Sequence, residues 1–203
     1  MRLPRIVNSF CLILLIFGAS RVTGQVPISA KIGWNHNFPK YDSDFKTDQS
    51  LSGWHAGLYA QFSLAKNLFL IPELQFSTRN YRLDLFMDDL RFGYIEIPLM
   101  LSWSPAKWIN LEAGPNIAFK MYSKTENGVS VDEVFDQNID VGFVVGPRFN
   151  FTNNLSVVTR YWWSIVPFSD HDFYNANGVP LGKLEVYNRA VEISFAWTFN
   201  PIQ

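Results

Sequence analysis

The chain has 203 residues, of which 17% are charged and 16% aromatic, and its formal net charge is -1. Soluble domains average about one-quarter charged residues, so this chain is poor in charge. The charge balance excludes the basic surface of a nucleic-acid-binding protein. No apolar run after residue 24 approaches the roughly 18 residues that a membrane-spanning helix needs.

An export signal is predicted over residues 1–24. Arg2 and Arg5 give this segment a positive start, and the apolar stretch 10–19 follows. Small or tolerated residues then lead to the expected cleavage point. An uncleaved anchor helix is the alternative, but the apolar stretch is short for a typical membrane span.

Cleavage of this signal would leave a mature domain over residues 25–203, beginning at Gln25. The only cysteine, Cys11, lies within the signal. The mature chain would therefore form no disulfide and carry no reactive thiol.

From residue 25 onward, apolar residues recur at every second position, which is the period of a β-strand. Each segment with this period is close to, or slightly longer than, the about 9–11 residues of a tilted transmembrane strand. No amphipathic helix of convincing length is evident. The eight segments are about 27–37, 53–64, 67–78, 91–103, 108–121, 138–152, 154–166 and 186–199.

The connections between these segments alternate in length. Three are short, at Ala65–Lys66, Ser104–Lys107 and Thr152–Asn154. Short turns on one rim and long loops on the other are typical of outer-membrane barrels, whose short turns face the periplasm. The four long, polar connections are 38–52, 79–90, 122–137 and 167–185.

Each segment has one apolar and one polar side. In the second segment, Trp54 and Leu58 share one side, whereas His55 and Tyr59 share the other. The charges within the strands all fall on the polar side. These residues are Lys31, Glu73, Glu96, Glu112, Arg148, Arg160 and Glu192.

Alternation alone does not decide which side faces outward. A soluble, lipocalin-like ligand-binding barrel would place the apolar side inside. An apolar exterior is favoured because the polar side holds few charges among small polar residues, and because aromatic residues gather near both strand ends on the apolar side. The predicted girdles are Trp34, Trp54, Trp163 and Tyr187 at the loop rim, and Phe62, Trp103, Trp197 and Phe199 at the turn rim.

These patterns together predict an all-β fold. The expected architecture is an eight-stranded antiparallel transmembrane β-barrel with up-and-down strand order, in the outer membrane of a Gram-negative cell. Its exterior would contact outer-membrane lipid. Four prolines within the predicted strands, where a closed barrel has no free edge, are interpreted as bulges or kinks. They are Pro72, Pro98, Pro115 and Pro147.

Seven short segments occur in order over nearly the whole mature chain: Lys31–Asn35, Gly53–Gly57, Ile71–Gln75, Tyr94–Leu99, Leu111–Pro115, Asp140–Gly146 and Arg160–Tyr161. Together they resemble the PorT-like outer-membrane β-barrel domains of Bacteroidetes-type bacteria. The resemblance implies an outer-membrane barrel, and its name-giving member is linked to protein secretion. The chain departs from many such barrels at its end, because residues 200–203 follow Phe199.

The sequence offers no catalytic centre, cofactor site or metal site. His36, His55 and His171 stand apart, without the spacing of a His-Glu-x-x-His or paired Cys/His motif. No serine, histidine and acid arrangement is visible, and no nucleophile and base share a strand end. We therefore predict a non-enzymatic protein, and an outer-membrane enzyme that acts on lipid is disfavoured.

The lumen charges are the group of residues in this sequence that best qualifies as a functional site. A lumen of eight strands is just wide enough for side chains to fill it. The favoured interpretation is a plug of paired charges in which Glu192 holds Arg160, which also reaches Glu73 or Glu96. We predict a monomer that acts through extracellular loops or through protein partners in the outer membrane or periplasm, including accessory work in secretion. A narrow small-solute or ion pore is the alternative.

Overall fold

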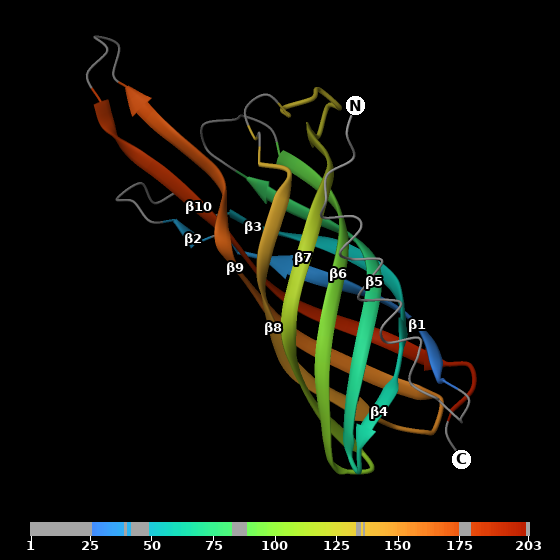
Figure 1. Cartoon of the computed structure of the whole chain (residues 1–203). Coiled ribbons are helices and arrows are strands. Elements are labelled where there is room, and N and C mark those ends of the chain that lie inside the picture. Colours follow the sequence, from blue (N-terminus) through green and yellow to red (C-terminus); the bar gives the residue numbers. More distant parts are fainter. Residues whose placement is uncertain are drawn as a thin grey trace, which may run out of the picture.

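The computed structural model describes residues 26–38, 40–41, 49–82, 89–132, 135, 137–174 and 180–201. Strands dominate this part of the chain and wind into a tilted barrel (Figure 1). Within the same ranges, no helix is long and apolar enough to cross a membrane. The predicted signal peptide 1–24 and the cleavage before Gln25 lie outside the described residues.

Each long strand pairs with its neighbours in the chain, in the order β1-β3-β5-β6-β7-β8-β9-β10. The short β4 continues β3 beyond Gln61, and the two-residue β2 pairs with β10. Counted in this way, the barrel has the predicted eight strands. The strands are β1 (Ile28–Asn37), β2 (Lys40–Tyr41), β3 (Gln49–Ala60), β4 (Phe62–Ala65), β5 (Leu68–Arg82), β6 (Asp89–Ala106), β7 (Ile109–Thr125), β8 (Ile139–Asn150), β9 (Leu155–Tyr174) and β10 (Pro180–Thr198).

The barrel closes because its first and last strands pair antiparallel. The pairing runs without interruption from Ser29 opposite Thr198 to Asn37 opposite Ala190. A Cβ atom at Gly33 would lie 2.0 Å from the carbonyl oxygen of Ile193. Glycine at this position therefore permits the close approach of β1 and β10 that closure requires.

Three tight turns occupy one rim of the barrel. They join β4 to β5, β6 to β7, and β8 to β9, and strand ends Ile28 and Thr198 lie at the same rim. The first turn is formed by Lys66 and Asn67, one residue later than predicted, and Asn67 has a φ of 64°. Asparagine tolerates this left-handed conformation in tight turns.

At the opposite rim the strands are longer than predicted. The prediction of a loop over residues 167–185 is wrong for most of these residues, because β9 continues to Tyr174 and β10 begins at Pro180. The resulting hairpin extends beyond the rest of the barrel (Figure 1). A strand outside the membrane needs no apolar face, so its backbone pairing can continue after the period-two pattern has ended.

Of the two interpretations of the strand prolines, bulges or kinks, the bulges are wrong. The pairing register is the same on both sides of each proline. In the β8–β9 ladder, pairing stops at Val145 opposite Tyr161 and resumes at Arg148 opposite Val158, on either side of Pro147. The missing donor therefore interrupts one ladder locally and leaves the alternation of faces intact.

The apolar side of the strands faces outward. Ile32, Leu58 and Leu74 are 62%, 56% and 55% exposed, whereas Glu96 and His55 are fully buried inside. An apolar surface that surrounds the molecule is unsuited to water but matches the lipid-facing band of a transmembrane barrel. The soluble, lipocalin-like alternative is therefore wrong, because it requires the opposite orientation.

Candidate functional site

All seven predicted lumen charges point into the barrel, and their exposed fractions range from 0% to 6%. They come from different strands, so the closed sheet brings together residues that are far apart in the chain. A buried charge is tolerated only when a partner compensates it. Most of these side chains have such partners, and they form two groups at different depths of the lumen.

The turn-side ion-pair group is centred on Arg160. Its Nη1 and Nη2 donate to the two carboxylate oxygens of Glu73 at 2.7 and 2.6 Å. Nη2 also donates to Glu112 Oε2 at 2.6 Å, and Lys31 Nζ donates to Glu73 Oε2 at 2.5 Å. This forked geometry gives arginine more contacts than a single ammonium group makes.

Arg148 completes the turn-side ion-pair group. Its Nε lies 2.7 Å from Glu112 Oε1, and its Nη1 donates to the Tyr59 hydroxyl at 2.5 Å. The guanidinium carbon also lies 4.5 Å from the centre of the Tyr59 ring. The group therefore holds Lys31, Arg148 and Arg160 against Glu73 and Glu112.

The loop-side ion-pair group is centred on Arg79. Its Nη1 donates to Asp140 Oδ2 at 2.8 Å, and its Nη2 donates to Glu96 Oε1 at 2.5 Å. The guanidinium carbon lies 3.8 Å from the centre of a Trp162 ring and 4.4 Å from that of Tyr94. Two carboxylates and two aromatic faces thus surround one buried cation.

Hydrogen bonds from neutral side chains also reach Glu96. Gln75 Nε2 and Asn116 Nδ2 both donate to its Oε2 at 2.9 Å, and the Ser77 hydroxyl donates to its Oε1. The carboxylate therefore receives bonds from β5 and β7, the strands on both sides of β6. This arrangement is what a buried carboxylate requires.

Two central members of the lumen network, Arg79 and Asp140, were absent from the sequence prediction. Arg79 fell just beyond the predicted end of its strand, although it lies on the polar side together with Glu73. Asp140 was within a predicted strand and on the same side as Arg148. Extending the alternation over the full strands would have found both residues.

The predicted contact between Arg160 and Glu192 is wrong. The two residues lie opposite each other in the pairing of β9 with β10. The hydrogen bonds of the guanidinium nevertheless go to Glu73 and Glu112. Glu96, the other predicted partner, contacts Arg79 instead.

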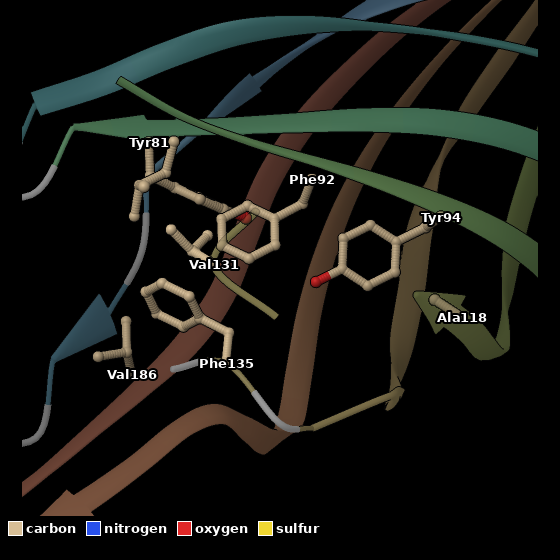
Figure 2. Packing of buried hydrophobic residues seen from close by; sticks show 8 residues of the cluster. Tyr81, Phe92, Tyr94, Ala118, Val131, Phe135 and Val186 are labelled. Carbon is tan, nitrogen blue, oxygen red and sulfur yellow. The ribbon is translucent and has the colours of Figure 1, made fainter. Parts of the chain in front are cut away.

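Buried apolar side chains fill the lumen beside the ion pairs. Phe92 packs against Phe135 with ring centres 5.2 Å apart, and against Tyr81 at 5.7 Å (Figure 2). The loop-side apolar cluster is Tyr81, Leu90, Phe92, Tyr94, Ala118, Val131, Phe135 and Val186. A second cluster comprises Tyr59, Ile71, Met100, Val144, Val158, Trp162 and Ala196.

The chain between β7 and β8 contributes Val131 and Phe135 to the loop-side apolar cluster. Lys120 Nζ donates to the carbonyl oxygen of Phe135, and the Ser123 backbone N–H donates to Asp132 Oδ1 at 2.9 Å. A second hydrogen bond, from the Ser123 hydroxyl, holds the pKa of the Asp132 carboxyl below its usual range. These contacts hold Asp132 and Phe135 against β7, beside the loop-side apolar cluster.

The predicted girdle residues differ in exposure. Trp34, Trp54, Trp103, Trp197 and Phe199 are each at least 50% exposed. The other three, Phe62, Trp163 and Tyr187, are half-buried. Trp163 stacks with Phe143 and with Tyr161, in each case with ring centres 5.8 Å apart.

The two histidines whose side chains the structure describes do not form a common site. His55 is buried, and its Nε2 lies 2.6 Å from the Ser194 hydroxyl, whereas His36 is exposed near Ser52. His171 belongs to β9, but its side chain lies outside the described residues. In the part of the chain that the structure describes, no group of three His, Cys, Asp or Glu side chains could hold a metal ion.

Comparison with known proteins identifies the same architecture. The attachment invasion locus protein Ail of Yersinia pestis, in complex with the heparin analogue sucrose octasulfate, is 14% identical; 87% of this chain and all of that chain are covered, with a TM-score of 0.53. Neisserial surface protein A is 10% identical over 85% of this chain and 97% of that chain, with a TM-score of 0.54. Such low identities show a shared fold only.

No curated protein matches the chain. A family model described as "Outer membrane protein beta-barrel domain" matches residues 20–170, which is most of the sequence. This match agrees with the closed barrel, the apolar exterior and the polar lumen. The chain therefore belongs to the outer membrane protein β-barrel domain family.

Proposed function

We propose that this protein is a non-enzymatic, non-conducting barrel that acts at its extracellular end or through protein partners. The observation that carries the proposal is the filling of the lumen. Arg160 joins side chains from β5 and β7 across the interior, and the loop-side apolar cluster packs nearer the other end of the lumen. A permeating ion would have to separate buried partners, which is strongly unfavourable when a charge is left alone.

The projecting hairpin of β9 and β10 is the surface we favour for a partner. It reaches farther from the turn rim than the neighbouring strands (Figure 1). Ail, which has a similar fold, is named for attachment and was solved with a heparin analogue. Attachment at the cell surface is therefore the leading role, and the resemblance to PorT-like domains makes accessory work in secretion the second.

We expect the wild-type protein to give no steady single-channel current when purified, refolded and added to planar lipid bilayers. The buried ion pairs of Arg160 and Arg79 lie within a lumen that eight strands make just wide enough for side chains to fill. A refolded porin of known conductance serves as the positive control for insertion. Stable current steps from the wild type would refute the plug and make the pore the leading function.

We also expect export with cleavage before Gln25. The intact mass of protein extracted from outer membranes should equal that of residues 25–203, and a closed barrel should migrate differently on a gel before and after boiling. Protein recovered in the soluble periplasmic fraction, or with the mass of the uncleaved chain, would contradict this expectation. A variant with Gly24 replaced by a bulky residue should retain the signal and provide the mass control.

A further inference from the structure

Three buried polar atoms around the Arg79–Glu96 ion pair have no hydrogen-bond partner. They are the side-chain oxygens of Gln75 and Asn116, which are acceptors, and Trp162 Nε1, which is a donor. Buried polar groups are almost always paired with protein or with ordered water. Three unpaired atoms beside one ion pair therefore require an explanation.

The two acceptors share one neighbour. Gln75 Nε2 and Asn116 Nδ2 donate to the same oxygen of Glu96, each at 2.9 Å. Because the oxygen and nitrogen of an amide are bonded to one carbon atom, both unpaired oxygens must lie close to this carboxylate. Neither amide can reverse its orientation without placing its oxygen against the Glu96 carboxylate and losing a charge-assisted hydrogen bond.

The donor lies at the same ion pair. Arg79 stacks on Trp162 at 3.8 Å, while its Nη2 donates to Glu96 at 2.5 Å. Trp162 is 1% exposed, so its indole N–H cannot reach bulk solvent. One donor beside Arg79 and two acceptors beside Glu96 therefore lie at the same ion pair, in the buried interior.

We infer that ordered water binds at this site, accepting a hydrogen bond from Trp162 and donating to Gln75 and Asn116. A buried water typically makes about three hydrogen bonds to otherwise unpaired groups. The unpaired atoms of the site are one donor and two acceptors, which one water, or two waters hydrogen-bonded to each other, can pair. Water held here is compatible with both a closed and a conducting lumen, so its test is independent of the conductance measurement.

The indole N–H of Trp162 reports directly on this water. In isotope-labelled protein refolded in micelles, the NMR signal of this N–H is identified as the indole signal that disappears in the variant Trp162→Phe. We expect a cross-relaxation peak between this N–H and water in the wild type. Absence of that peak would overturn the inference.

Paired variants test whether the two amides hold the water. In the variant Gln75→Leu/Asn116→Leu, we expect the water peak of Trp162 to fall at least several-fold. Asn110→Leu is the matched control, because the side-chain oxygen and nitrogen of Asn110 are already paired with Asn150 and Ser104. An unchanged peak in the folded double variant would overturn the assignment. If that variant does not fold, water density within hydrogen-bond distance of Trp162 Nε1 in a high-resolution wild-type structure supports the site, and its absence overturns it.

Discussion

Arg160→Ala is expected to lower the free energy of unfolding by about 3–5 kcal/mol, as is typical when one partner of a buried ion pair is removed. The guanidinium donates three hydrogen bonds to the buried carboxylates of Glu73 and Glu112. Without it, each carboxylate keeps a single cationic partner, Lys31 for the first and Arg148 for the second. The measurement is a denaturant titration of the protein refolded in lipid vesicles. The midpoint should fall clearly relative to the wild type.

Two further variants show whether charge compensation is the cause. Adding Glu73→Gln to Arg160→Ala should lower the midpoint further, because Lys31 then loses its carboxylate partner and remains as an uncompensated buried cation. Arg91→Ala is the matched control, since Arg91 forms an exposed ion pair with Glu126 and such pairs contribute little. Equal losses for Arg160→Ala and Arg91→Ala would contradict the account of the turn-side ion-pair group.

Leu58→Arg is expected to destabilise the barrel by about 2–4 kcal/mol, the effect of a cation near the bilayer midplane. Leu58 is 56% exposed on the apolar exterior and pairs with Leu74 near the middle of β5. The same titration in lipid vesicles measures this loss.

Val129→Arg controls for the general effect of adding a cation. Val129 is 62% exposed but lies on the chain between β7 and β8, at the loop rim. An arginine there can remain in water, so little change in the midpoint is expected. Equal effects at Leu58 and Val129 would show that the apolar exterior does not contact lipid.

The membrane-embedded part of the fold was well predicted from sequence. Alternation over about one membrane thickness revealed the eight strands and their two faces, because lipid on one side and a polar lumen on the other impose a period of two. Residues 167–174 and 180–185 lacked this signal. Their pairing depends on backbone hydrogen bonds of an emerging hairpin, which leave no apolar pattern in the sequence.

The candidate site was predicted only in part. Alternation identified which charges enter the lumen, but it does not specify how far each side chain reaches. Arg160 therefore appeared to pair with Glu192 on the adjacent strand, whereas its long side chain reaches Glu73 and Glu112. Which charged residues pair in a narrow barrel depends on the curvature of the sheet and on side-chain rotamers. The alternation of apolar and polar residues along a strand specifies neither of these.

The central claim is that the apolar face contacts lipid while the polar face is closed inside. It is tested most directly by spin labels on single cysteines, since Cys11 is the only native cysteine and lies in the predicted signal. Labels at Ile32→Cys and Leu74→Cys, in protein refolded in lipid vesicles, should collide with oxygen, which concentrates in lipid, and avoid a water-soluble nickel complex. A label at Val129→Cys should show the opposite preference. Labels at Ile32 and Leu74 that meet the nickel complex more readily than oxygen would contradict the account.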